Sequence, residues 1–184
     1  YNWSDTSINV DESGSYRKSL GLTDKIVFFY GGNIGHAQDM MNIVRLAQAL
    51  SAYSQAHFLL VGKGDDVDLI LAAIEDNNIK NITYLDSVGQ HEYNQMLMEF
   101  DVVIFSLHSD NKTHNFPGKL LVYMKYSKPI VGSVNIGNDL KDVLENSQSG
   151  LVSINGDDGA LVKNALKLLE SLEIRQEMGD NAYK

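Results

Sequence analysis

Short apolar runs alternate along this chain with longer stretches in which apolar residues recur every three or four positions. The runs have the length and the branched and aromatic composition of buried strands, and they lie at Lys25–Tyr30, His57–Val61, Asn81–Leu85, Val102–Leu107, Pro129–Val131 and Gly150–Ile154. The periodic stretches predict helices at Ser15–Leu22, Met40–Leu50, Asp65–Ile74, His91–Phe100, Pro117–Tyr126, Asn138–Asn146, Asp157–Leu172 and Ile174–Lys184. This alternation predicts an α/β fold, a Rossmann-like parallel sheet of about six strands with helices on both faces.

A glycine-rich turn joins the first strand to the helix that follows it. Gly31, Gly32 and Gly35 remove side chains where the chain enters the helix. The N-terminus of such a helix presents free backbone N–H groups and a partial positive charge, and phosphate groups bind there in nucleotide-handling α/β folds. A tight turn without a ligand would have the same glycines, so this turn alone does not decide between the two interpretations.

Composition narrows the class of protein. The 184 residues are 43% hydrophobic and 21% charged, which is typical of a globular domain, and the formal net charge is −9. An acidic chain lacks the basic footprint of a nucleic-acid-binding protein, so we expect no nucleic-acid partner. The chain has no cysteine for a disulfide framework or a thiolate metal site, and no apolar run is long enough to span a bilayer.

The N-terminal residues differ from the rest of the chain. Residues 1–14 are polar and lack periodicity, and the chain begins at Tyr1 rather than at a methionine. These residues also lack the pattern of a signal peptide. We therefore expect a fragment of a longer protein, in which residues 1–14 form a linker and residues 15–184 form one domain.

Ligands of open parallel sheets bind beyond the carboxyl ends of the strands. The turns expected at this edge are Gly31–His36, Gly62–Gly64, Asp86–Gly89, His108–Gly118 and Ser133–Gly137. The richest of them leads into Pro117, Gly118 and Lys119. If Pro117 is the first helical residue, Phe116 occupies the capping position and leaves backbone donors free for an anion, beside the charge of Lys119. In the alternative, Asn115 caps the helix and Lys119 is a solvated surface lysine.

The histidines add little further chemistry. His108 and His114 share a loop with Asp110, but the loop lacks a defined spacing of metal ligands, so we expect no metal site. A second helix start at His36 brings Asn33 and His36 near the first glycine turn. No nucleophile with a neighbouring base is evident, so the sequence indicates no catalytic machinery within this chain.

Six segments taken together resemble a known family. They are FFYGGNIGHAQDMMNIVRLA, HFLLVGKGDD, NITYLDSV, the apolar run Asp101–Phe105, NFPGKLLVYMKYSKPIVGSV and SGLVSINGDD. In this order and spacing they resemble the C-terminal donor-binding domain of GT-B-fold glycosyltransferases of the retaining family 4, the group 1 transferases. The sequences of these segments most resemble those of the bacterial branch that builds lipopolysaccharide O-antigen, core or capsule.

The resemblance implies a two-domain enzyme whose N-terminal acceptor domain is absent from this sequence. Residues 1–14 would be the interdomain linker, and residues 15–184 would bind the donor, a UDP- or GDP-sugar. The sugar would pass with retention of configuration to a lipid-linked or lipopolysaccharide glycan, with no metal or other cofactor required. The resemblance also implies a cytoplasmic enzyme, and it leaves open a peripheral association with the inner face of the cytoplasmic membrane. The isolated domain should be inactive because it holds half of the cleft.

The resemblance also assigns roles to individual positions. Those implied for nucleotide and phosphate binding are Gly32, Asn33, Gly35, His36, Lys63, Ser87, Val88 and Lys119. Those implied for the donor sugar are His114, Asn115, Phe116, Pro117 and Gly118. No residue within this domain is assigned a catalytic role, and no residue is assigned to a metal.

Four positions depart from the family pattern. Many relatives carry two glutamates around this helix, one near the donor sugar and one on the ribose hydroxyls, and here these positions hold His114 and Val122. Many also carry an arginine and a lysine in the first glycine turn, where this chain has Asn33 and Gln38. Two formal cations are therefore missing from a site that must hold a diphosphate.

Other classes of protein remain as alternatives. An NAD-binding domain would need G-x-G-x-x-G and an acidic residue after the second strand, where this chain has G-G-x-x-G and Val61-Gly62-Lys63. A receiver-type signalling module would need an acidic cluster beyond the first and third strands, and the first strand ends in glycines. A GT-B sugar-nucleotide epimerase matches the segments less well. A degenerate GT-B scaffold without donor binding is kept open by His114 and Val122.

Overall fold

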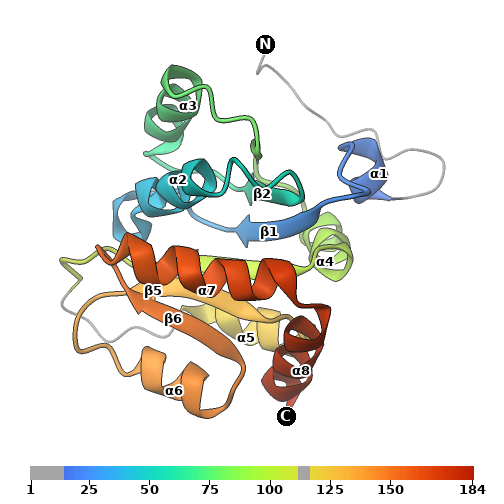
Figure 1. Cartoon of the computed structure of the whole chain (residues 1–184). Helices are drawn as coiled ribbons and strands as arrows, with labels where there is room; N and C mark the ends of the chain where they lie inside the picture. Colours follow the sequence, from blue (N-terminus) through green and yellow to red (C-terminus); the bar gives the residue numbers. More distant parts are fainter. Residues whose placement is uncertain (1–14, 112–116) are drawn as a thin grey trace.

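The computed structural model describes residues 15–111 and 117–184, which form a six-stranded sheet with every pair of neighbours parallel. The strands are β1 (Ile26–Gly31), β2 (Ala56–Val61), β3 (Ile82–Leu85), β4 (Val102–Ser106), β5 (Ile130–Val134) and β6 (Gly150–Ile154). Their order is β3-β2-β1-β4-β5-β6, so the direction of winding reverses between β1 and β4. Figure 1 shows β2 beside β1 and β5 beside β6 on the two sides of this point. The predicted Rossmann-like α/β fold is confirmed.

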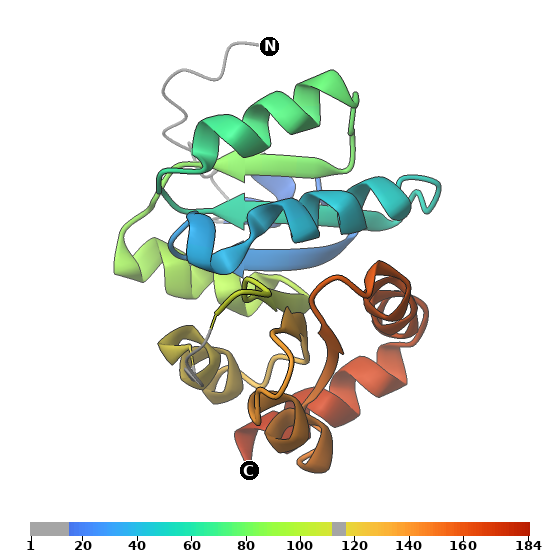
Figure 2. The same ribbon diagram turned by 90° about the vertical axis from the view of Figure 1, so that its left-hand side faces the viewer.

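Helices cover both faces of this sheet. They are α1 (Tyr16–Ser19), the 3₁₀ helix η1 (His36–Gln38), α2 (Met40–Ala49), α3 (Val67–Asp76), α4 (Gln90–Glu99), α5 (Gly118–Lys125), α6 (Leu140–Asn146), α7 (Asp158–Glu170) and α8 (Leu172–Tyr183). One face packs against α2, α3 and α7, and the other packs against α1, α4, α5 and α6. Figure 2 shows α5 and α7 on opposite sides of β5 and β6. None of the helices within the described ranges is both long and apolar enough to cross a membrane.

The strands are apolar on both faces because each face is covered by helices. Within β1, the alternating side chains of Phe28 and Phe29 enter different halves of the core. Phe28 stacks on Phe58 of β2 with ring centroids 4.9 Å apart, and Phe29 lies 5.6 Å from the ring of Phe100. The central strand is therefore fixed from both sides, and its carboxyl end projects from a rigid base.

The contact between β1 and β4 is short. β1 pairs with β2 along its whole length, from Ile26 to Gly31, but it pairs with β4 only at Phe28–Val102 and Phe29–Val103. The last two residues of β1, Tyr30 and Gly31, have no ladder partner on β4. Ligands of open α/β sheets bind where the winding reverses, so this separation marks the expected position of a site.

Candidate functional site

A cavity of about 490 Å³ opens at the carboxyl edge of the sheet, between the ends of β1 and β2 and the helices α4 and α5. It is lined by Gly31, Gly32, Asn33, Val61, Gly62, Lys63, Ser87, Val88, Gln90, Tyr93, Gly118, Lys119 and Val122. This set contains seven positions that the sequence analysis assigned to a donor, namely Gly32, Asn33, Lys63, Ser87, Val88, Gly118 and Lys119. None of the lining residues within the described part of the chain is acidic. The cavity therefore suits a ligand that carries negative charge.

Backbone rather than side chains forms one wall of the cavity. The turns after β1 and β2 run side by side, with the Gly32 N–H donating to the Val61 carbonyl at 2.9 Å and the Ile34 N–H donating to the Lys63 carbonyl at 2.9 Å. A Cβ atom placed on Gly62 would lie 1.8 Å from the carbonyl oxygen of Gly32. Glycine is needed at position 62 because the two turns touch there.

Two tyrosines from the helices pack against the end of β1. The ring of Tyr93 on α4 lies so close to Gly31 that a Cβ atom there would be 2.2 Å from it. The hydroxyl of Tyr123 on α5 accepts the Gly31 N–H at 3.3 Å. Burial raises the pKa of both phenols, so both remain protonated near neutral pH. The end of β1 is therefore packed against two uncharged phenols, of which Tyr93 lines the cavity.

The N-terminus of α5 opens toward the cavity without a side-chain cap. The helix begins at Gly118, and Pro117 is its capping residue, with an extended backbone (ψ 122°) and no side-chain hydrogen bond. The prediction that Pro117 is the first helical residue and Phe116 the cap was therefore wrong by one position, because the proline keeps an extended ψ. The predicted positions His114, Asn115 and Phe116 lie outside the described residues.

Lys119 supplies a half-buried cation at this helix start. Its Nζ atom lies 3.9 Å from the centroid of the Tyr30 ring. Burial lowers the pKa of Lys119 to about 7. Among residues 15–111 and 117–184, no carboxylate lies within ion-pair distance of its ammonium group. The alternative of a solvated surface lysine does not describe this side chain.

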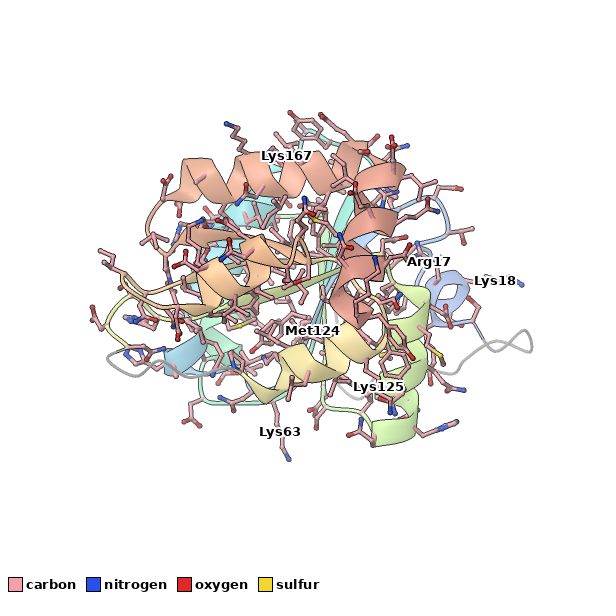
Figure 3. All side chains as sticks on the ribbon, turned by 90° about the horizontal axis from the view of Figure 1, so that it is seen from below. Arg17, Lys18, Lys63, Met124, Lys125 and Lys167 are labelled. Carbon is pink, nitrogen blue, oxygen red and sulfur yellow. The ribbon has the colours of Figure 1, made fainter. Side chains whose placement is uncertain are left out.

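Compared with Lys119, the other polar residues of the cavity either carry no charge or are more exposed to solvent. Lys63 is exposed, and in Figure 3 its side chain extends away from the body of the molecule. The side-chain amide of Asn33 donates to Gln38 Oε1 at 2.9 Å, so the two polar residues of the first turn pair with each other. Val122 lines the cavity with an apolar side chain. Lys119 is consequently the enclosed cation of the described site.

His36 belongs to a different part of the edge, and Gly35 is not among the described residues that line the cavity. The His36 ring packs on His108 with centroids 4.4 Å apart, and both line a separate hollow of about 210 Å³ that includes Asp39 and Asp66. The His108 Nδ1 atom accepts the N–H of Asp110 at 3.1 Å. Within the described residues, no group of three or more potential metal-ligating side chains comes together. The structure therefore does not bring His36 into the cavity that holds Lys119.

Three residues at this cavity had no functional signal in the sequence. Tyr30 and Tyr93 belong to apolar patterns that predict only a strand and a helix face, and Gln90 lies at a helix start. The composition of these segments is the same whether the aromatic rings fill a core or border a ligand site. Only the proximity of α4 and α5 to the end of β1 shows their position.

The sequence and the fold were compared with those of known proteins. A sequence model of the family described as "Glycosyl transferases group 1" matches residues 13–184, which is nearly the whole chain. None of the curated proteins matches.

Several solved structures have a similar fold. HepE from Anabaena, in complex with UDP-glucose, gives a TM-score of 0.73 at 18% identity, covering 91% of this chain and 45% of that protein. WaaG, a glycosyltransferase involved in lipopolysaccharide biosynthesis, gives 0.71 at 13% identity, covering 91% and 44%. The C-terminal domain of the group 1 protein LpcC from Francisella tularensis gives 0.68 at 12% identity, covering 85% and 81%. The chain spans less than half of HepE and WaaG but most of the isolated C-terminal domain.

Proposed function

The chain belongs to the group 1 family of glycosyl transferases, and we propose that it is the domain of such an enzyme that binds a nucleotide-sugar donor. The donor would be a UDP- or GDP-sugar, held in the cavity between β1, β2, α4 and α5. Residues 1–14 would then connect this domain to a second one that holds the acceptor. The likeness to the C-terminal domain of LpcC supports this division.

One observation carries the proposal: an enclosed ammonium group lies at an uncapped helix N-terminus, beside turns made of bare backbone. Lys119 and the amides at the start of α5 carry positive charge, and no acidic side chain of residues 15–111 and 117–184 lines the cavity. This combination favours a diphosphate. Val61, Val88 and Tyr93 offer apolar and aromatic surface for a nucleoside beside it. The UDP-glucose in the structure of HepE supports a donor of this class.

The chemistry proposed for this domain is electrostatic. As the glycosidic bond to the nucleotide breaks, negative charge grows on the leaving diphosphate, and Lys119 with the N-terminus of α5 would stabilise it. These groups would take the charge without a metal ion. The acceptor hydroxyl would approach from the second domain, and the sugar would be transferred with retention of configuration. The acceptor would be a lipid-linked or lipopolysaccharide glycan at the cytoplasmic side of a membrane, and the involvement of WaaG in lipopolysaccharide biosynthesis supports an acceptor of the lipopolysaccharide class.

Calorimetric titration tests the donor site. The panel is UDP, GDP, UDP-glucose, UDP-N-acetylglucosamine and GDP-mannose, each titrated into the domain. Lys119→Ala should weaken the binding of the preferred nucleotide by about tenfold to a hundredfold, because a charge-assisted hydrogen bond contributes about 1.5–3 kcal/mol. Lys167→Ala is the matched control, since Lys167 is an exposed lysine on α7, which covers the opposite face. Equal affinities of the two variants would remove Lys119 from the site.

A second candidate function keeps the fold and lacks donor binding. Asn33 donates a side-chain hydrogen bond to Gln38, where many relatives carry cations, and Val122 presents no acceptor to a ribose. Both features favour a scaffold domain that assists a separate active transferase. Absence of binding for the entire panel, found also with the complete protein, would support this candidate over the first.

A further inference from the structure

Tyr30 connects the two elements that form the proposed phosphate site. It is the last aromatic residue of β1, it is fully buried, and its ring belongs to the half of the core that α2, α3 and α7 cover. Its hydroxyl donates a hydrogen bond to the carbonyl oxygen of Asn33 in the glycine-rich turn. The ring of the same side chain lies beneath the ammonium of Lys119. One residue thus contacts both the turn after β1 and the side chain from α5.

The path of Lys119 to that ring depends on the separation of β1 from β4. α5 covers the opposite face of the sheet from the side of the core that holds Tyr30. The lysine can reach across because β1 has no partner on β4 beyond Phe29 and because the turn carries no side chain at Gly32. A Cβ atom on Gly32 would lie 3.0 Å from Lys119 Nζ. The ammonium therefore occupies space beside Gly32, on the side of β1 where its last two residues have no partner on β4.

The surroundings of this ammonium lack compensating charge. The ammonium contacts the ring of Tyr30 on β1, and the other titratable side chains of the described cavity lining are Tyr93 on α4 and Lys63 in the turn after β2. Tyr123 on α5 lies behind them, against Gly31. No carboxylate of the described residues pairs with the ammonium. The negative face of an aromatic ring attracts a cation, most strongly where water is excluded. Tyr30 is thus the group that offsets the desolvation of this cation while the cavity is empty.

We propose that Tyr30 is a positioning residue for donor binding, whose ring holds the Lys119 ammonium at the β1–β4 opening and whose hydroxyl fixes the turn beside it. This inference rests on the proposed function as far as the donor is concerned. The contact between Tyr30 and Lys119 can be measured without any ligand.

The arrangement links ligand binding to proton uptake. Because burial lowers the pKa of Lys119 to about 7, part of the amine is neutral at physiological pH in the empty domain. A bound diphosphate favours the ammonium, so a proton enters with the ligand. Affinity should fall as the pH rises above about 7, by roughly tenfold to thirtyfold between pH 6.5 and pH 8.5. The probes are UDP-glucose and GDP-mannose, whose phosphates carry no titrating proton in this range.

The first experiment measures Lys119 directly in the ligand-free domain. Carbon-13-labelled lysine gives a Cε resonance for Lys119, identified by its loss in Lys119→Met, and its midpoint is followed by NMR as a function of pH. Tyr30→Phe keeps the ring, so the midpoint should stay near that of the unmodified protein. Tyr30→Leu removes the ring, so the ammonium should become harder to form, by about threefold to thirtyfold in its protonation constant. Affinity for the nucleotide sugar at pH 7 should likewise change less in Tyr30→Phe than in Tyr30→Leu.

A matched control separates positioning from a general loss of packing. Phe28→Leu truncates a buried aromatic residue on the same strand and in the same part of the core, where the ring stacks on Phe58 rather than on a lysine. It should lower stability without moving the Lys119 midpoint. The inference is overturned if Tyr30→Leu leaves the midpoint where Phe28→Leu leaves it, or raises it. If no nucleotide sugar binds the unmodified protein, the proposed function fails, while the midpoint still decides the contact.

Discussion

Acid should destabilise this protein through one buried imidazole, that of His57. The side chain is 8% exposed on β2, and its Nε2 atom shares a hydrogen bond with Thr83 Oγ1 on β3 at 2.9 Å. Burial, with the positive charge of Lys25 as a smaller cause, lowers the pKa of His57 to about 4 from its ordinary value of 6.5. The folded protein thus resists a proton that the unfolded chain accepts.

The magnitude follows from the two pKa values. Above pH 6.5 the imidazole is neutral in both states and has no effect on the free energy of unfolding. As the pH falls from 6.5 toward 4, the unfolded state binds a proton and the folded state does not, which costs about 1.4 kcal/mol of stability per pH unit. The loss is about 2 kcal/mol at pH 5, and it is complete near pH 4.

Urea unfolding of His57→Gln between pH 7.5 and pH 5.0 isolates this contribution. Glutamine does not titrate, and its amide can reach Thr83, so the stability difference between variant and unmodified protein should shift by about 2 kcal/mol in favour of the variant. Thr83→Val is the control, because it removes the hydrogen bond but keeps the buried imidazole, so its acid sensitivity should persist. A difference between His57→Gln and the unmodified protein that is independent of pH would refute the reasoning.

Two further predictions concern the cavity. Gly62→Ala should lower the free energy of unfolding by about 1–3 kcal/mol, because the added methyl group would lie 1.8 Å from the carbonyl oxygen of Gly32. Urea unfolding measures this loss, and unchanged stability would contradict the described contact. Val122→Glu should tighten nucleotide binding about tenfold in calorimetry, because a carboxylate lining the cavity can accept hydrogen bonds from ribose hydroxyls. Val122→Gln should gain less, and equal affinity of all three proteins would place the ribose elsewhere.

The sheet could be predicted from the sequence because its strands are buried on both faces and read as apolar runs. The exception is instructive: the fifth strand was predicted to end at Val131, and β5 continues to Val134. The turn after this strand was predicted to begin at Ser133, yet the Ser133 hydroxyl is buried and paired with Ser153 Oγ on β6 at 2.8 Å. A polar residue whose partner lies on a neighbouring strand gives no local signal of its burial.

The candidate site could be predicted only in part. Glycines and a proline give a local signal, so the turns and the helix start that line the cavity followed from the sequence. The place of His36 did not, because the 3₁₀ turn η1 sets its ring against His108, which is distant in sequence. The role of Tyr30 was hidden for a related reason. An aromatic residue in a strand has the same local pattern whether a methyl group or an ammonium lies on its ring.

The short ladder between β1 and β4 also bears on how the chain folds. The strands on its two sides are contiguous in sequence, with β1 to β3 within residues 26–85 and β4 to β6 within residues 102–154. Each half can form its sheet hydrogen bonds from contacts of modest sequence separation, and within the sheet only the two residue pairs of the β1–β4 ladder join the halves. Helices such as α2 and α7 also pack on each other across this boundary. Local contacts form faster than distant ones, so the two halves should assemble as separate cooperative units and dock afterwards. The opening at which we propose that the donor binds would then be the last part of the sheet to form during folding.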